Sequence, residues 1–283
     1  MTISNITRYE RPENLATALR LLQDGQGRAV PLAGGTALLG APPREVESVV
    51  DLSGLKLDWI SPTEAGGLSL GAMVTLAALM ASEEGRGYAG GTLVEAMRYS
   101  AGNLVRNRAT LGGTLIGCAS SSDLVALLLA LGATVVLYEG TEREIELSDL
   151  YRRRAYHLQP GSLLTEVRLP ALPAGSGVSL QRVARTPMDQ PILTVAACAT
   201  RAGARLGELR LAASALGNGA DPARLSSAES ALRGTELGSS AFDVVLARAA
   251  DGLAIQGDHL ASADYRRAMI PVLVRRALEK AAS

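Results

Sequence analysis

Two glycine-centred stretches, Leu32-Ala33-Gly34-Gly35-Thr36-Ala37-Leu38 and Thr110-Leu111-Gly112-Gly113-Thr114, decide how this sequence is interpreted. The first follows Arg28–Leu32, a short apolar run that predicts a buried strand. The second is followed by Ser120-Ser121-Ser122-Asp123 and then by Leu124–Leu131, which predicts a buried helix. Because glycine lacks a Cβ and adopts positive φ, such stretches allow backbone N–H groups to approach a phosphate closely. A pyrophosphate site is therefore one interpretation of the pair.

The same residues also allow a simpler interpretation. A Gly-Gly-Thr is more often a tight turn than a phosphate site, and Asp123 alone is more often a helix cap than an acceptor for a ribose or ring hydroxyl. Neither stretch matches Gly-x-Gly-x-x-Gly or Gly-x-x-x-x-Gly-Lys-Ser/Thr, which disfavours a Rossmann or P-loop site. From the residues alone, both interpretations stay open.

Composition excludes several classes of function. The 283-residue chain has 28 basic and 28 acidic residues, and this balance argues against a nucleic-acid binder. No stretch reaches the roughly 20 apolar residues that a membrane helix needs, and Met1–Tyr9 lacks the layout of a signal peptide. We therefore expect a cytoplasmic protein without a membrane span. Two cysteines cannot ligate an iron–sulfur cluster, which normally takes four. With only His157 and His259 as nitrogen ligands, a structural zinc site is poorly supported, so no metal ligands are expected.

The order of the predicted elements indicates an α+β protein. A helix over Glu13–Asp24, a strand and a glycine loop form an α/β unit, and the Pro- and Gly-rich Pro170–Gly177 predicts a domain boundary. Three strands are expected beyond it, at Val178–Val183, Leu193–Thr200 and Leu209–Ala215. Three helices then follow, at Ala223–Arg233, Ala241–Ala250 and Asp264–Ala281. In the last helix, the spacing predicts a core face of Tyr265, Met269, Val272 and Leu273.

Several motifs together resemble the FAD-binding medium subunit of the xanthine dehydrogenase and carbon monoxide dehydrogenase family. They include Tyr9-Glu10-Arg11-Pro12, the first glycine stretch, Val50-Asp51-Leu52-Ser53, Leu70–Thr75, and Arg106-Asn107-Arg108-Ala109 leading into the second stretch. Near the end, Tyr265–Met269 and Val274–Leu278 resemble the C-terminal domain of the family. The resemblance covers nearly the whole chain.

The resemblance implies a fold and a cofactor. It implies a two-subdomain α/β FAD-binding domain of the PCMH type at residues 1–170, with subdomains at about 1–55 and 56–170. An α+β C-terminal domain with a small antiparallel sheet and helices would occupy 178–283. The residues that it assigns to FAD are Pro31, Leu32, Ala33, Gly34, Gly35, Thr36, Ala37, Leu38, Ser100, Thr110, Leu111, Gly112, Gly113, Thr114, Asp123 and Leu164. No catalytic side chain is expected, because the flavin itself carries the electrons.

The resemblance also implies partners. Electrons would reach this chain from a large molybdopterin-binding subunit through a small subunit with [2Fe–2S] clusters, and would leave to NAD+, oxygen or another acceptor. The sequence departs from the family pattern at Ala37, where Asp or Ser is frequent, and at Thr114, where Asn is usual. Gln181 stands where relatives use a basic residue near the flavin, and Cys118 stands where they carry other small residues. Two alternatives stay open. One is a stand-alone FAD oxidase of the related flavin fold, against which the short C-terminal region and the absence of a suitable histidine count. The other is a non-catalytic scaffold that has lost FAD, for which Ala37 and Thr114 are the only indications.

The remaining polar residues are interpreted as structural. His157 follows Arg152–Arg154, and we expect it in a surface loop, as we do His259. The arginine run is expected to face solvent or a partner subunit, and Cys118 to fill a loop.

Overall fold

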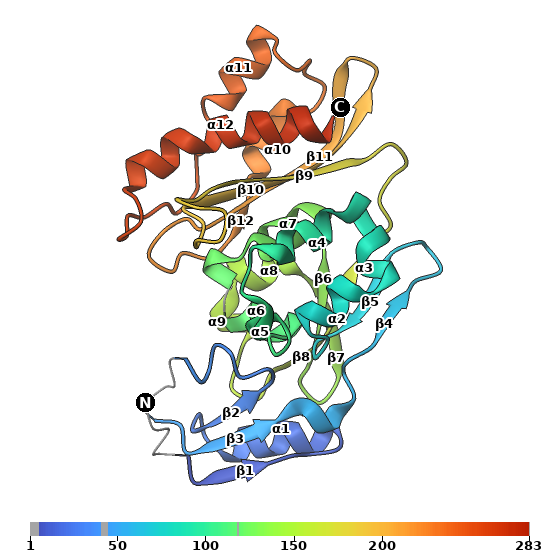
Figure 1. The fold of residues 1–283 in the computed structure, drawn as a ribbon, viewed down its shortest axis with the longest axis vertical. Coiled ribbons are helices and arrows are strands. Elements are labelled where there is room, and N and C mark those ends of the chain that lie inside the picture. Colours follow the sequence, from blue (N-terminus) through green and yellow to red (C-terminus); the bar gives the residue numbers. More distant parts are fainter. Residues whose placement is uncertain (1–5, 41–44, 118, 283) are drawn as a thin grey trace.

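The computed structural model describes residues 6–40, 45–117 and 119–282. Figure 1 shows three sheet-containing parts that follow one another along the long axis, from the N-terminal strands to the C-terminal helices. Cys118 and the Pro42-Pro43 pair lie outside the described residues. Within the described residues, no helix combines the length and the apolar character needed to cross a membrane.

The first part is a small parallel sheet, in the order β1-β3-β2, with one helix beside it (Figure 1). Its elements are β1 (Arg8–Glu10), α1 (Leu15–Asp24), β2 (Ala29–Leu32), β3 (Ser48–Asp51) and the 3₁₀ turn η1 (Leu52–Leu55). Helix α1 is capped by Asn14, whose side chain accepts from the amide of Thr17, and it turns Ala18, Leu19 and Leu22 inward. The predicted helix, strand and glycine loop are thus confirmed in their order.

The second part is an antiparallel sheet, in the order β4-β5-β8-β6-β7, covered by short helices. The strands are β4 (Ile60–Pro62), β5 (Leu68–Gly71), β6 (Thr134–Tyr138), β7 (Glu142–Glu146) and β8 (Leu163–Leu169). The helices are α2 (Leu76–Ala81), α3 (Glu83–Gly87), η2 (Tyr88–Gly91), α4 (Thr92–Arg98), α5 (Asn103–Arg106), α6 (Leu111–Gly117), η3 (Ala119–Ser121), α7 (Asp123–Leu131), α8 (Leu147–Arg152) and α9 (Arg154–His157).

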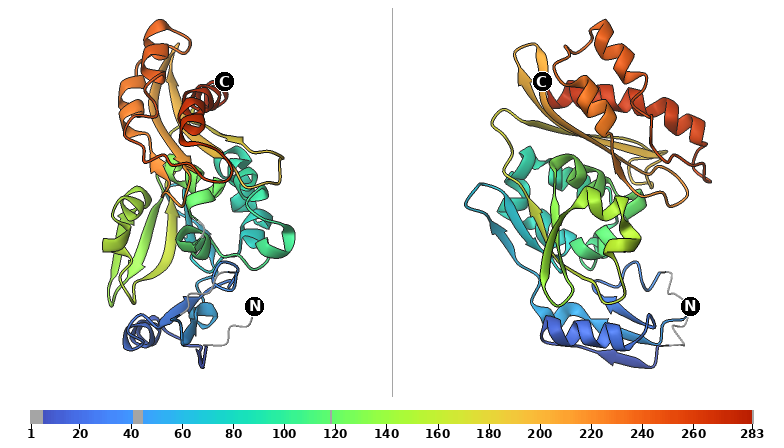
Figure 2. Two further views of the ribbon diagram at one scale, coloured as in Figure 1. Left: turned by 90° about the vertical axis from the view of Figure 1, so that its left-hand side faces the viewer. Right: turned by 180° about the vertical axis from the view of Figure 1, so that it is seen from behind.

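The third part is an antiparallel sheet, in the order β12-β11-β10-β9, with helices gathered at the C-terminal end of the molecule (Figure 2). Its strands are β9 (Gly177–Val183), β10 (Leu193–Ala202), β11 (Arg205–Ser214) and β12 (Ala223–Arg224). Its helices are α10 (Ser226–Leu232), α11 (Ser240–Leu246) and α12 (Ala263–Ala281). The antiparallel C-terminal sheet with helices confirms what the resemblance implied.

Helix α7 lies at the centre of the molecule. The side chain of Ser122 accepts from the amide of Val125 at its start, and Gly132 ends the helix with φ 76°. All nine residues between them are buried. Such a helix needs partners on every side, and it packs against both the second part and the C-terminal sheet.

The C-terminal sheet is covered on both faces because residues of a strand point alternately to its two sides. On β10, Ala196 belongs to the core around α7, while Val195 and Ala197 belong to the core around α10–α12. Ala212 of β11 and Leu180 of β9 also join the α7 core. The C-terminal part therefore shares apolar packing with the part before it.

One expectation for the C-terminal part was wrong, and a second was right only for Leu273 and the partly buried Met269. Residues 223–233 are not one helix, because Ala223 and Arg224 pair with β11 and the helix begins only at Ser226. The core face of α12 is Ile270, Leu273, Val274 and Ala277, whereas Tyr265 and Val272 are 43% and 37% exposed. The face is rotated because Arg266 points inward, where carbonyl groups and a carboxylate satisfy its guanidinium.

Candidate functional site

The first glycine stretch continues from β2 as a loop that lies directly against the second stretch. A Cβ built on Gly34 would stand 1.7 Å from the carbonyl oxygen of Arg108, so the two backbones touch and only glycine fits. Gly35 has φ 76°, which also favours glycine. At the far end, a Cβ on Gly117 would lie 3.0 Å from the Cβ of Ala37. The fold thus brings together the two stretches that are far apart in the sequence.

The backbone amides of the first stretch are available to a ligand. Within the described residues, none of the backbone N–H groups from Ala33 to Leu38 donates a hydrogen bond to another group of the chain. The next N–H group, that of Leu39, donates to the carbonyl of Gly35 at 2.9 Å. The residues are half-buried or exposed, so their polar groups remain accessible. Consecutive backbone amides without internal acceptors form the kind of concavity that binds phosphate oxygens. The residues present therefore fit a pyrophosphate.

The second stretch has a different role in the structure. It begins helix α6, and its amides are already engaged: Leu111 donates to Val74 at 2.8 Å and Gly112 to Ala72 at 2.8 Å. Gly113 and Thr114 donate to the side chain and the carbonyl of Thr110, at 3.2 and 2.9 Å. A Cβ on Gly112 would meet Ala72 at 2.9 Å. This stretch therefore supports the first loop from behind, and its glycines allow close packing rather than free amides.

Asp123, the first residue of α7, lies at the contact with the C-terminal part. Its side chain is only 1% exposed. Its Oδ1 accepts from the hydroxyl of Thr194 on β10, and its Oδ2 lies 3.2 Å from Nε of Arg182 on β9. Burial raises the pKa of the Asp123 carboxyl, against the opposing effects of Thr194 and Arg182. One carboxylate oxygen thus accepts a hydrogen bond from Thr194, and the other faces the charge of Arg182 without a hydrogen bond to its Nε.

The last two predicted contacts lie in other places. Ser100 follows α4, and its hydroxyl donates to the carbonyl of Ala96 at 2.8 Å. Leu164 lies on β8 opposite Leu137 and is 8% exposed within the core around α7. The structure therefore unites the two glycine stretches and places Asp123, Ser100 and Leu164 on separate elements around them.

Arg182 was missed by the sequence analysis, which pointed to its neighbour Gln181. The Gln181 amide donates to Ser179 on its own strand at 3.1 Å. Arg182, on the other side of the strand, faces Asp123 and stacks over the ring of Tyr99 at 5.0 Å. A signal was present, because a charged residue near the end of an apolar strand requires a partner when it is buried.

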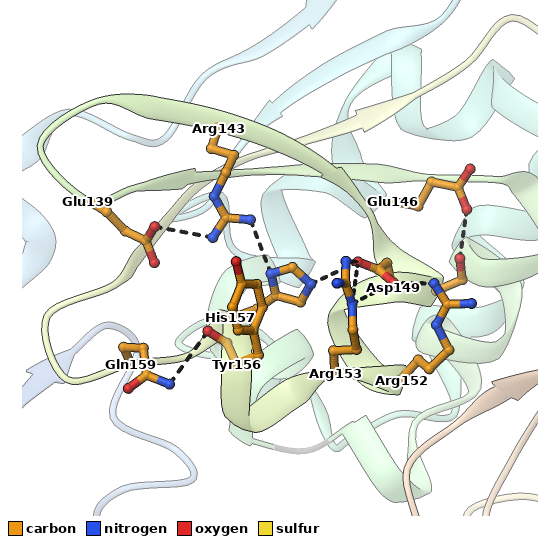
Figure 3. A network of polar contacts seen from close by, with 10 residues as sticks. Glu139, Arg143, Glu146, Asp149, Arg152, Arg153, Tyr156, His157 and Gln159 are labelled. Carbon is orange, nitrogen blue, oxygen red and sulfur yellow. Dashed lines mark hydrogen bonds and ion pairs between the residues drawn. The ribbon is translucent and has the colours of Figure 1, made fainter.

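His157 is a second correction, because it is buried and not in a surface loop (Figure 3). Its Nε2 lies 2.8 Å from Oδ2 of Asp149, and its Nδ1 lies 3.1 Å from the Arg143 guanidinium. Since arginine only donates, Nδ1 accepts and Nε2 carries the proton that is donated to Asp149. The ring therefore joins β7 to α8 and α9.

The arginines beside His157 complete the network in Figure 3. Arg153 and Arg152 bond to Asp149 and hold the pKa of that carboxyl below its usual range. Their own side chains are 53% and 76% exposed, which confirms a solvent-facing run for these two. Arg154 instead contacts the Ile116 carbonyl and Asp221. The network connects β7, α8 and α9 at one end of the second part.

The described residues contain no group of three or more His, Cys, Asp or Glu side chains that would hold a metal ion. Cys198 is buried on β10, and burial raises the pKa of its thiol, so it is not a reactive thiolate. His259 is exposed in the segment before α12.

Comparison with known proteins identifies the same two regions. Residues 4–172 match the family described as "FAD binding domain in molybdopterin dehydrogenase", and residues 179–281 match "CO dehydrogenase flavoprotein C-terminal domain". The carbon monoxide dehydrogenase medium chain of Afipia carboxidovorans is 31% identical, with 96% of each chain covered. The nicotine 6-hydroxylase medium subunit of Paenarthrobacter nicotinovorans is 28% identical over 97% of this chain and 96% of the relative.

Solved structures agree over 97% or more of the chain. A Cu,Mo-CO dehydrogenase chain in its cyanide-inactivated form superposes with a TM-score of 0.87 at 29% identity, with 98% of each chain covered. A chain of quinoline 2-oxidoreductase from Pseudomonas putida 86 gives a TM-score of 0.83 at 27% identity, covering 97% and 96% of the two chains. This chain therefore belongs to the family of FAD-binding medium subunits of molybdenum hydroxylases.

Proposed function

We propose that the loop Ala33–Leu38 holds the pyrophosphate of FAD and that this chain transfers electrons within a molybdenum hydroxylase complex. The observation that carries the proposal is the run of backbone amides that find no acceptor in the described residues, in a loop pressed against Arg108. The chain has equal numbers of basic and acidic residues and therefore no excess of cationic side chains. Backbone N–H groups are then the donors best suited to bind the pyrophosphate oxygens.

The assignment of further residues follows from their positions. Gly34 and Gly35 allow the loop to run against Arg108, and the hydroxyl of Thr36 is an added donor. The segment Thr110–Thr114 supports the loop, while Pro31, Ser100 and Leu164 are proposed to contact other parts of the cofactor. When bound, FAD supplies the redox chemistry; the chain binds it, orients it and limits the access of water. We also propose the domain limits 1–170 and 178–283 for the two functional units.

The complex is proposed to contain two further subunits. With two cysteines, this chain cannot supply the four thiolates of a [2Fe–2S] cluster, so the clusters and the molybdopterin are assigned to a small and a large partner. Relatives matched over 93% or more of their length are named as a medium chain or a subunit of a complex, which favours this over a stand-alone oxidase. NAD+ or oxygen is proposed as the final acceptor.

The cofactor assignment is tested with Gly34→Ala. The new Cβ would overlap the Arg108 carbonyl and force the loop away from its support. We expect FAD affinity to fall at least about tenfold, about 1.4 kcal/mol, in titrations of the apoprotein followed by flavin absorbance. Gly87→Ala is the matched control, since a Cβ there meets nothing within 4 Å. Full FAD occupancy in Gly34→Ala, or a wild-type chain that takes up no FAD, contradicts the proposal.

The subunit assignment is tested by affinity purification from the native host. We expect co-purification of a large molybdenum protein and a small iron–sulfur protein, with flavin reduction when the substrate of the complex is added. Reoxidation by NAD+ or by oxygen, followed separately, identifies the acceptor. A chain that purifies alone and oxidises a substrate by itself would instead support a stand-alone oxidase.

A further inference from the structure

An ion pair that the cofactor assignment does not use lies between helix α7 and the C-terminal sheet. It joins Asp123, at the start of α7, to Arg182 near the end of β9, with Nε 3.2 Å from Oδ2. The Asp123 side chain is 1% exposed and that of Arg182 13% exposed, so both charges are largely removed from water. Thr194 on β10 donates to the other carboxylate oxygen. Two parts of the fold thus meet at this pair.

The Arg182 guanidinium also holds a loop. One terminal nitrogen donates to the carbonyl of Pro187 at 2.5 Å and the other to the carbonyl of Asp189 at 2.7 Å. Both carbonyls belong to the connection between β9 and β10, where the backbone makes few bonds of its own. Arginine has five donors in a fixed plane, so a single side chain can face Asp123 and clamp this loop at once.

The same guanidinium fixes the end of helix α4. It lies over the ring of Tyr99, 5.0 Å from the ring centre. Tyr99 directly precedes Ser100, one of the proposed flavin contacts. Tyr99, Arg182 and the loop residues Arg185–Pro187 line one cleft of about 420 Å³. The position of Arg182 therefore bears on the end of α4 and on the loop together.

A direct contact between Asp123 and a flavin hydroxyl is disfavoured by this geometry. A carboxylate binds a ligand hydroxyl through an oxygen with a free lone pair on an open side, and Asp123 exposes almost no surface. Its Oδ1 accepts from Thr194, whereas its Oδ2 faces Nε of Arg182 at 3.2 Å as an ion pair without a hydrogen bond, so burial is what disfavours a ligand contact. Removing one partner of such a buried pair leaves the other charge uncompensated, which is costly.

We infer that Asp123 supports FAD binding indirectly, as the buried counter-ion that holds Arg182 in place. Arg182 is in turn the positioning residue for the 184–189 loop and for the Tyr99–Ser100 end of α4. This inference rests on the proposed function, because it assigns a route by which the C-terminal part acts on the flavin site. Under this inference, Asp123 contacts Arg182 and not FAD, and Arg182 positions the residues around the flavin.

The test is a double-mutant cycle with Asp123→Asn, Arg182→Gln and the double variant, measured as FAD affinity of the apoprotein. If the pair acts as one unit, each single variant weakens FAD at least about tenfold and the double variant is no weaker than the singles. Arg233→Gln is the control, since it removes the same charge from an arginine of the C-terminal part that is 54% exposed and pairs with Glu208, outside this cleft. Its FAD affinity should equal that of the wild type.

Other outcomes overturn the inference. If Asp123→Asn weakens FAD while Arg182→Gln does not, Asp123 contacts the cofactor directly. If the single variants lower the melting temperature but bind FAD as well as the wild type, the pair is only structural. If the wild type binds no FAD, the proposed function itself fails, and this inference fails with it.

If a single variant does not fold, two other measurements still test the inference. The double variant carries no buried charge at the pair, and is expected to fold and to bind FAD at least about tenfold more weakly. Tyr99→Leu removes the stacked ring without touching either charge, and should change the visible circular dichroism of bound flavin. Wild-type affinity in the double variant together with a wild-type spectrum in Tyr99→Leu would contradict the inference.

Discussion

Arg266 shows at the residue scale how one buried cation organises the chain around it. It is 1% exposed on α12 and donates to the carbonyls of Ile192, Gln256 and Ala261. Its remaining nitrogen donates to Asp258 at 2.6 Å. Ile192 is the last residue of the connection between β9 and β10, and Arg182 bonds to Pro187 and Asp189 earlier in the same connection. Two arginines thus hold the connection between β9 and β10.

Asp258 gives this arrangement a defined dependence on pH. Burial opposes its ionisation, but hydrogen bonds from Arg266 and from the amides of Leu260 and Ala261 outweigh burial and lower its pKa to about 2. A lowered pKa means that the ionised group stabilises the fold above its ordinary pKa of about 4, and that this contribution is lost as pH falls toward the folded value.

The corresponding prediction concerns Asp258→Asn. We expect its free energy of unfolding to be lower than that of the wild type at pH 7, with the difference shrinking between about pH 4 and pH 2. Urea denaturation at a series of pH values measures it. Asp251→Asn removes an exposed partner of Arg248 and should cost no more than about 1 kcal/mol. A difference for Asp258→Asn that stays constant down to pH 2 would disprove the assignment.

At the scale of elements, helix α12 depends on its first turn. It is 19 residues long, contains Pro271, and is capped at its start by Ser262, whose Oγ accepts from the amide of Tyr265 at 3.1 Å. A serine in this position satisfies an amide that the helix leaves without a partner. The helix covers one face of the C-terminal sheet, so weakening its start weakens the core of that part.

Ser262→Ala should therefore lower the free energy of unfolding by about 1 kcal/mol. Ser227→Ala, at an exposed position of α10, is the matched control and should change it by no more than about 0.5 kcal/mol. Thermal and chemical denaturation compare the two variants. Equal effects in both would show that the Ser262 cap contributes nothing specific.

At the scale of the whole molecule, the C-terminal sheet joins the flavin-family fold into one unit. Its β10 strand directs Ala196 toward α7 and Ala197 toward α12, and both are fully buried. Because the contact is apolar and tightly packed, the two parts are expected to unfold together in a single transition. Two well-separated transitions of the wild type in calorimetry would contradict this.

Ala196→Glu is the variant that tests this contact. It places a carboxylate without a designed partner between the sheet and α7, so we expect the free energy of unfolding to fall by more than about 3 kcal/mol. Ala202→Glu, at the exposed end of the same strand, should be nearly neutral. Similar losses in the two variants would mean that strand propensity, and not the buried contact, decides stability.

Much of the local structure could be predicted because it depends on neighbouring residues. The strand before Gly34, the glycine loop, and the helix between Ser122 and Gly132 follow from periodicity, turn residues and caps. The residues around the glycine stretches carried the family resemblance. By contrast, β12 was missed because Ala223 and Arg224 gain their strand geometry only from pairing with β11.

The sequence by itself determined that two glycine stretches and an α+β chain of this family were present, because glycine content and hydrophobic periodicity are local properties. Only the tertiary structure decided that the amides of one stretch are open while those of the other are engaged. It also decided that His157 is buried beside Asp149 and that Arg182 faces Asp123. The physical reason is that burial and charge pairing depend on which segments pack together. The charge at the end of an apolar strand indicates that Arg182 needs a partner, but not that this partner is Asp123, 59 positions away.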